Sequence, residues 1–336
     1  MKYFILTQIL FLTKLMGFAQ QVMLVDSITK NPVSYATVYD ANGSVIGRSD
    51  MGGYINLQKG FEYHISHISY EPMSLIYIND DSIISLSPSS YKISEVNVTA
   101  KKKKYYHCKV YFRSIEHVDS CLKYYMDGIR EFYIDTKSKK VHCGNIETHY
   151  FMSKRKDIAQ KKRSMMIGDR YMAFPFLDKN TLYEETMRDK KRNIASGIVY
   201  ADSTSIGSCE VLFDKNEMLL SIDALFPQNT LVTNLFGYTQ VLSKYNKTEL
   251  YQYDGFDAPS VFNLKSSNSY RHLTLTHKKE NLVRNIDVED VFYVVEYEYT
   301  DTKELSSSKL LQEDYNRYSG MFPVIERIRE QLIREE

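Results

Sequence analysis

Turn-forming residues recur at short intervals between residues 20 and 100, and they limit this part of the chain to short elements. They are Asn31-Pro32, Asn42-Gly43, Gly52-Gly53, Gly60 and Glu71-Pro72. Runs rich in β-branched and aromatic residues lie between them, at 21–25, 34–39, 44–48, 54–57, 62–66, 73–77, 82–86 and 95–99. Such spacing predicts an all-β sandwich of about seven strands.

The composition agrees with a β-rich, globular protein. The 336 residues include 28 Tyr and 16 Phe but no Trp, and Tyr and Phe favour strands. With 43% hydrophobic and 25% charged residues, the chain is neither collagen-like nor wholly disordered. Its length suggests about two domains.

An ordered set of residues in the first 100 resembles a known family. The set is Val25-Asp26, Pro32-Val33, Ala36-Thr37-Val38, Gly47, Ser49-Asp50, Gly52-Gly53-Tyr54, Ser69-Tyr70-Glu71 and Ile93-Ser94-Glu95-Val96. It resembles the carboxypeptidase-regulatory-like domain, a transthyretin-like (immunoglobulin-like) β-sandwich found on exported Gram-negative bacterial proteins. Because such domains accompany zinc carboxypeptidases without holding an active site, the resemblance implies an accessory module. They also precede outer-membrane transporters, but residues 101–336 are too few for a large barrel and plug.

The N-terminus has the pattern of a secretory signal peptide. Lys2 precedes an apolar stretch, and Gly17 and Ala19 supply small residues before a cleavage site. We therefore expect residues 1–19 to be removed near Ala19, which places the mature protein in the periplasm or at the outer-membrane surface. An uncleaved membrane anchor is the alternative, and Lys14, which interrupts the apolar run, argues against it.

Basic residues concentrate just after the predicted sandwich. Residues 101–163 contain 17 Lys and Arg against 7 Asp and Glu, although the whole chain has a net charge of only +1. We interpret the four lysines at 101–104 as a solvated linker, and the run at 154–163 as an exposed loop. An exported protein rarely meets nucleic acid, so no nucleic-acid partner is expected.

Residues 105–336 are predicted to form an α+β domain with a large antiparallel sheet and a C-terminal helix. Helices are expected at 114–126, 216–226 and 321–334. Strands are expected at 128–137, 141–152, 197–201, 208–214, 238–242, 248–253, 260–264, 270–277 and 291–300. In the last strand, Tyr293, Val295, Tyr297 and Tyr299 should share one face, opposite Glu296 and Glu298.

The four cysteines, Cys108, Cys121, Cys143 and Cys209, include no CxxC pair. Buried free thiols are favoured, because a core of this size needs no covalent staple, but one or two disulfides remain an alternative.

No catalytic, cofactor or metal site emerges from the sequence. His277 and Glu280 supply the first part of a zinc carboxypeptidase ligand set, but no histidine follows them, so a metallopeptidase-like hydrolase is disfavoured. His64 and His67 should point to opposite faces of a strand, as should His142 and Cys143, with His149 nearby. The acidic groups Glu184-Glu185 and Asp287, Glu289, Asp290 are interpreted as surface charge.

Ser27 and Ser82 lie in Asp-Ser-aliphatic sequences that resemble bacterial O-glycosylation acceptors.

These observations predict an exported, non-enzymatic binding or assembly protein of the bacterial cell envelope. Its partner would be an envelope protein, a glycan or a lipid, with peripheral attachment to the outer membrane. The absence of Trp weighs modestly against a dedicated sugar cleft. The second hypothesis is a periplasmic carrier that shelters an apolar ligand in a curved sheet, and its signature would be an apolar cavity of several hundred Å³. A hydrolase comes third.

Overall fold

The computed structural model describes residues 20–78, 82–89, 94–95, 103–155, 170–212, 215–225, 230–235, 237–279, 281–322, 324 and 326–334. The predicted signal peptide, the first half of the lysine linker and most of the 154–163 run lie outside these residues. Within them the chain is mostly β, with two small N-terminal sheets followed by one large sheet.

The N-terminal region is a two-sheet β-sandwich, as the turn spacing predicts. Its strands are β1 (Gln20–Asp26), β2 (Thr37–Asp40), β3 (Val45–Arg48), β4 (Tyr54–Leu57), β5 (Glu62–His67), β6 (Tyr70–Ile76) and β7 (Ile83–Leu86). One sheet has the order β4-β1-β7 and the other β3-β2-β5-β6. Leu24 and Leu57 of the first sheet pack with Val38 and Ile65 of the second in a shared core, so apolar burial holds the two sheets together.

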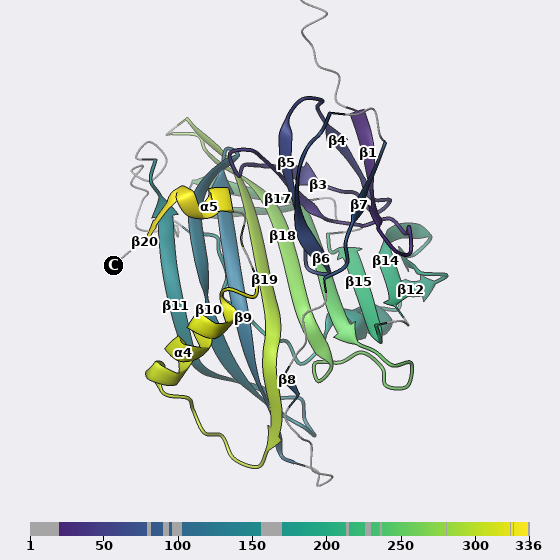
Figure 1. Cartoon of the computed structure of the whole chain (residues 1–336), viewed down its shortest axis with the longest axis vertical. Coiled ribbons are helices and arrows are strands. Elements are labelled where there is room, and N and C mark those ends of the chain that lie inside the picture. Colours follow the sequence, from purple (N-terminus) through teal and green to yellow (C-terminus); the bar gives the residue numbers. More distant parts are fainter. Residues whose placement is uncertain are drawn as a thin grey trace, which may run out of the picture.

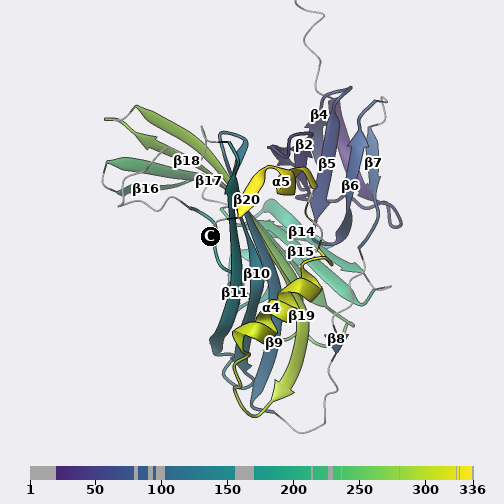
Figure 2. The ribbon, with the colours of Figure 1, turned by 60° about the vertical axis from the view of Figure 1, so that its left-hand side comes forward.

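The rest of the described chain forms one long, mainly antiparallel sheet (Figure 1). Its main order is β12-β13-β14-β15-β17-β18-β19-β9-β10-β11-β20, with β16 beside β17 and β8 beside β19. The strands are β8 (Ser94–Glu95), β9 (Tyr105–Val118), β10 (Cys121–Asp135), β11 (Val141–Ser153), β12 (Arg192–Ala195), β13 (Ile198–Ala201), β14 (Thr204–Leu212), β15 (Glu217–Asp223), β16 (Leu231–Leu235), β17 (Tyr238–Gln252), β18 (Leu264–His277), β19 (Leu282–Thr300) and β20 (Leu332–Arg334). Figure 2 shows the ends of β16, β17 and β18 projecting from the body of the sheet.

The predicted helix at 114–126 is wrong, because this segment forms the end of β9 and the start of β10. Asp119 and Ser120 both have positive φ and close a tight hairpin between the two strands. Ile115 pairs directly with Tyr125 across the hairpin, and both pack in one cluster with Leu122, as they would on one helix face. Val118, which would share that helix face, packs in another cluster. Nearly all of β9 is buried on both sides, which removes the alternation that would have marked a strand.

Several other observed elements differ from the predicted ones. The segment expected as a helix at 216–226 contains the buried strand β15. In the segment expected as a strand at 260–264, only Leu264 is in a strand, where it begins β18. The segments 238–242 and 248–253 belong to one strand, β17. The hairpin of 128–137 with 141–152 is confirmed as β10 and β11.

Three helices accompany the large sheet in the described residues: α3 (Leu182–Arg188), α4 (Ser308–Tyr318) and α5 (Glu326–Glu330). The predicted helix at 321–334 shortens to α5, because Leu332–Arg334 pairs with β11 as the edge strand β20. The longer helix α4 was not predicted. It starts at Ser307, whose hydroxyl accepts the Leu310 amide, and it buries Leu311 and Tyr318 against the sheet. No helix in the described part is long and apolar enough to cross a bilayer.

A register shift in β19 overturns the predicted alternation at 293–299. Val294 pairs with Val110 and Glu296 with Lys109, so Val295 is an extra residue. Tyr293 and Val295 pack in the cluster that contains α4, whereas Tyr297 and Tyr299 pack against the core on the opposite face.

The sandwich docks on the same face of the large sheet as α4 and α5 (Figures 1 and 2). At the contact, Thr37 and Tyr39 donate hydrogen bonds of 2.8 and 2.5 Å to the carboxylate of Glu289, and Asn268 donates another at 2.9 Å. Burial alone would raise the pKa of Glu289, but the positive charge of Arg48 and the Tyr39 hydroxyl hold it below its ordinary value. A buried, hydrogen-bonded carboxylate therefore ties the sandwich to the large sheet.

A strap-roofed cavity on the far face of the sheet

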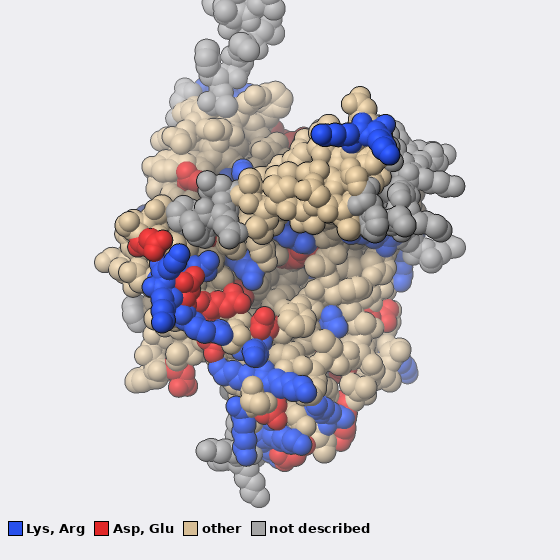
Figure 3. Space-filling view, turned by 180° about the vertical axis from the view of Figure 1, so that it is seen from behind, with Lys and Arg blue, Asp and Glu red and all other residues tan. Residues whose placement is uncertain are grey.

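An extended segment, residues 170–181, lies across the face of the large sheet that is turned away from the sandwich. We call it the strap; it has no helix or strand of its own. Lysine and arginine side chains gather, with acidic ones among them, across the lower half of the view of this side in Figure 3. Its upper half is mostly uncharged apart from a basic group at the upper right.

Charged side chains from five neighbouring strands hold the strap in place. Glu116 of β9 accepts the Tyr171 amide at 2.5 Å, and Asp290 of β19 accepts the Ala173 amide at 3.1 Å. Arg271 of β18 donates to the Tyr171 carbonyl at 2.9 Å. These contacts satisfy backbone groups that no strand pairing reaches.

The far end of the strap is fixed in the same way. Arg130 of β10 donates to the Pro175 carbonyl at 3.0 Å, and Glu249 of β17 accepts the Leu182 amide at 2.8 Å, at the start of α3. Thr181 caps that helix in a reciprocal arrangement with Glu184. The strap is thus anchored at both ends and cannot shift without breaking charge-assisted hydrogen bonds.

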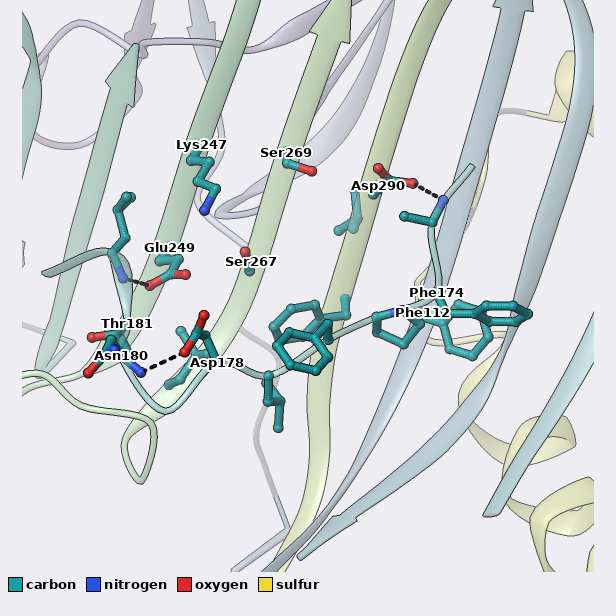
Figure 4. Close-up of a pocket in the computed structure, with 18 of the residues that line it drawn as sticks. Phe112, Phe174, Asp178, Asn180, Thr181, Lys247, Glu249, Ser267, Ser269 and Asp290 are labelled. Atoms are coloured by element: carbon teal, nitrogen blue, oxygen red, sulfur yellow. Dashed lines mark hydrogen bonds between the residues drawn. The ribbon is translucent and has the colours of Figure 1, made fainter. Parts of the chain in front are cut away.

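A cavity of about 250 Å³ lies between the strap and the sheet (Figure 4). Aromatic rings line one side: Phe112 and Phe292 from the sheet, and Phe174 and Phe176 from the strap. The rings of Phe112 and Phe174 meet edge to face with centroids 6.3 Å apart. The other side, over β17 and β18, is polar, so the lining is amphipathic.

The buried carboxylates of the cavity are already engaged by the protein. Glu249 accepts hydrogen bonds from the Tyr251 hydroxyl and the Leu182 amide. Asp290 accepts from the Ser114 hydroxyl and from Arg271 as well as from Ala173. Burial raises the pKa of both carboxyl groups above their ordinary values.

Hydrogen-bond donors also line the cavity floor, and the carboxylates of Asp178 and Glu185 lie elsewhere in the lining. Lys247, Ser267 and Ser269 point into the cavity from β17 and β18 (Figure 4). Lys247 has no carboxylate within ion-pair distance among the described residues, and its ammonium group lies 5.6 Å from the centre of the Tyr245 ring. Neither serine hydroxyl makes a hydrogen bond within the described part of the chain.

The acidic group at 287–290 is not surface charge, contrary to the sequence prediction. Asp287 and Glu289 are buried at 8% and 5% exposure on the sandwich side, and Asp290 lies on the cavity side. Glu184 caps α3 and Glu185 lines the cavity. The alternation of residues along β19 divides these acids between the two faces.

The histidines form no shared site. His277 stacks on Tyr238, with ring centroids 4.2 Å apart, and Glu280 lies outside the described residues. His149 stacks on Tyr315, while His64 pairs with the Ser74 hydroxyl. In the described ranges, no group of three potential ligands could hold a metal ion.

All four cysteines are free: Cys108 and Cys209 are buried, Cys121 is partly buried and Cys143 is exposed. The disulfide alternative therefore has no geometric support in this structure. Burial raises the pKa of the Cys108 thiol and brings that of Cys209 to about 11, so neither is a reactive thiolate.

A second cleft of about 410 Å³ lies between the sandwich and the C-terminal segment that contains α5. His64 and Ser74 line it on one side, and Val324 and Arg327 on the other. Among the described residues that line it there is no Phe, Tyr or strap segment.

Comparisons with known proteins leave the family open. No family model matches the chain, and no curated protein matches it. Among solved structures, one of lipovitellin, which concerns lipid–protein interactions in that protein, aligns with 62% of this chain at 12% identity and a TM-score of 0.29. The alignment spans 27% of the lipovitellin chain. At that TM-score the likeness carries no argument about function.

Proposed function

We propose that this protein is a non-enzymatic binding protein exported to the bacterial cell envelope, and that its ligand site is the strap-roofed cavity. The observation that carries the proposal is that the strap is anchored over the cavity. Five strands each contribute a charged side chain to hold an irregular segment over a cavity. Fixing such backbone costs conformational entropy, and loops that a rigid scaffold positions often carry binding residues.

The engaged state of the carboxylates favours binding over catalysis. General acid–base chemistry needs a carboxyl group that can reach the substrate and exchange a proton with it. In this cavity Glu249 and Asp290 are occupied by internal hydrogen bonds, so their role is to position the strap. A small ligand would meet rings, hydroxyls, the Lys247 ammonium group and the carboxylates of Asp178 and Glu185.

The sandwich fits the role of an accessory or assembly module, as its resemblance to carboxypeptidase-regulatory-like domains implies. It docks on the face opposite the cavity, so a ligand can enter without displacing it. Together with the predicted signal peptide, this supports a protein of the periplasm or outer-membrane surface that links a binding domain to an envelope partner.

A carrier for a whole lipid is supported less well. That hypothesis expects an apolar cavity of several hundred Å³, whereas this one measures about 250 Å³ and has a polar side. A carrier therefore remains the second hypothesis for the function of this protein, and a hydrolase remains the third.

Native mass spectrometry of the protein recovered from a Gram-negative host tests the proposal. We expect a mature chain that begins at Gln20 and carries a bound small molecule. The cavity-filling variant Ser269→Phe should lose that molecule, whereas Thr276→Phe, farther along the same strand, should keep it. Equal occupancy in both variants, or substrate turnover abolished by a single substitution, would contradict the proposal.

A further inference from the structure

The cavity contains unused hydrogen-bond donors on one side and aromatic rings on the other. On its polar side Glu249 and Asp290 already accept protein hydrogen bonds, whereas the Ser267 and Ser269 hydroxyls make none within the described residues. The Lys247 ammonium group lies beside Tyr245 and has no carboxylate within ion-pair distance there. Such donors recognise a ligand atom that accepts hydrogen bonds and carries negative charge.

We propose, given that the cavity is the binding site, that its ligand is a small amphiphilic carboxylate. The carboxylate group would lie against Lys247, Ser267 and Ser269, and the apolar part would lie along Phe112 and Phe174. The two halves of the ligand correspond to the two halves of the lining in Figure 4.

Lys247 suits the role of charge partner for the carboxylate. Burial would lower its pKa, but Tyr245, Glu185 and Glu249 outweigh burial and raise it, so the amine stays protonated at neutral pH. Glu249 is held by its own hydrogen bonds to Tyr251 and the Leu182 amide, and Glu185 lies beyond ion-pair distance of the ammonium group. An incoming carboxylate would therefore find an ammonium group without an ion-pair partner in the described structure.

The aromatic side suits an alkyl chain or a ring. Phe174 and Phe176 of the strap are 46% and 65% exposed, although Leu177 next to them is buried. Two exposed rings at the mouth of a cavity form the apolar surface that a ligand's hydrocarbon portion would cover. The strap's anchors keep both rings beside the opening, so binding needs little reorganisation.

The size of the cavity limits the ligand. About 250 Å³ lies just below the usual range for small-molecule sites, which is too little for a two-chain lipid. A medium-chain fatty acid or an aromatic carboxylate fits this limit. Because the lining is aromatic on one side and polar on the other, it suits a ligand that is neither a plain hydrocarbon nor a sugar.

Isothermal titration of the full mature chain with octanoate, 1-octanol and N-acetylglucosamine tests the ligand class. Octanoate and octanol share a hydrocarbon chain and differ in the carboxylate. We expect octanoate to bind at least tenfold more tightly than octanol. Lys247→Met, which keeps the apolar stem, should remove that preference and leave octanol binding unchanged. Lys244 is an exposed lysine on the same strand, so Lys244→Met is the matched control and should keep the preference for octanoate.

The outcomes separate the ligand class from the proposed function. Equal binding of octanoate and octanol, or an unchanged preference in Lys247→Met, overturns the carboxylate proposal. Binding of N-acetylglucosamine alone, lost in Ser269→Phe, also overturns it but leaves the cavity as the binding site. If none of the probes binds and native mass spectrometry finds no bound molecule, the proposed function fails as well. Thermal unfolding of each variant shows whether a loss of binding reflects a loss of fold.

Discussion

The Tyr39 hydroxyl of the sandwich donates a 2.5 Å hydrogen bond to Oε2 of Glu289 in the large sheet, where both side chains are buried. This bond joins the sandwich to the large sheet through two residues that lie 250 positions apart in the sequence. Arg48 lies close enough to lower the pKa of Glu289, and its guanidinium group also lies over the Tyr270 ring. The sandwich and the large sheet are therefore packed together at this contact through buried side chains, as within a single core.

Tyr39→Phe should lower the free energy of unfolding by about 1.5–3 kcal/mol, because a charged acceptor loses a buried donor. Tyr54, in β4 of the other sandwich sheet, is 40% exposed, so Tyr54→Phe is the control and should change the free energy of unfolding little. Urea denaturation of the two variants measures the difference. Equal effects would mean that the interface hydrogen bond does not couple the domains.

Glu210 of β14 should make stability depend on pH near neutrality. Burial, with the nearby charge of Asp26, raises its pKa to about 7, above the ordinary 4.5. The folded state therefore binds the proton more tightly than the unfolded state. The destabilisation is present above pH 7 and disappears as the pH falls from 7 toward 4.5.

Glu210→Gln should therefore stabilise the protein by about 2 kcal/mol at about pH 8 and by little at about pH 5. Denaturation curves of the wild type and the variant at both pH values provide the measurement. If the difference in free energy of unfolding between variant and wild type is the same at both pH values, Glu210 titrates normally.

Ser120→Gly distinguishes the observed hairpin from the helix that the sequence favours. Ser120 has φ of 65° in the tight turn between β9 and β10, where glycine avoids the Cβ clash, so the change should stabilise by about 0.5–1 kcal/mol. In the middle of a helix the same change would destabilise by about 1 kcal/mol. The sign of the shift in thermal midpoint decides between the two conformations.

Asp290→Ala should release the strap locally. The Ala173 amide loses its acceptor, so its hydrogen exchange should accelerate at least about tenfold relative to the Ile129 amide in the core of β10. Asp290→Asn keeps an acceptor oxygen and should retain most of the protection. Equal acceleration at Ala173 and Ile129 would indicate global destabilisation instead of strap release.

The β-rich architecture could be predicted from the sequence where one face of an element is solvated or a turn is marked by its residues. The sandwich turns and the hairpin of β10 with β11 are such cases. Prediction failed at β9, where both faces are buried and the apolar pattern loses its period of two. It also failed at Val295, because a bulge depends on the pairing partner and not on local composition.

The cavity could not have been predicted from the sequence. The strap has no secondary structure, and its anchors Glu116, Asp290 and Glu249 lie 55 to 117 residues away along the chain. Each anchor looks like ordinary surface charge until the sheet order places it beneath the strap. The available signal was the acidic cluster at 287–290, whose members alternate between the faces of one strand.

Amide chemical shifts of the mature protein during titration with octanoate test most directly whether the strap-roofed cavity is the ligand site. We expect the shifts to concentrate in residues 171–182, 245–249 and 267–269, with little change in the sandwich. Shifts that concentrate instead around His64 and Val324, in the cleft between the sandwich and α5, would contradict this assignment, as would no shifts in the strap at a concentration where binding is saturated.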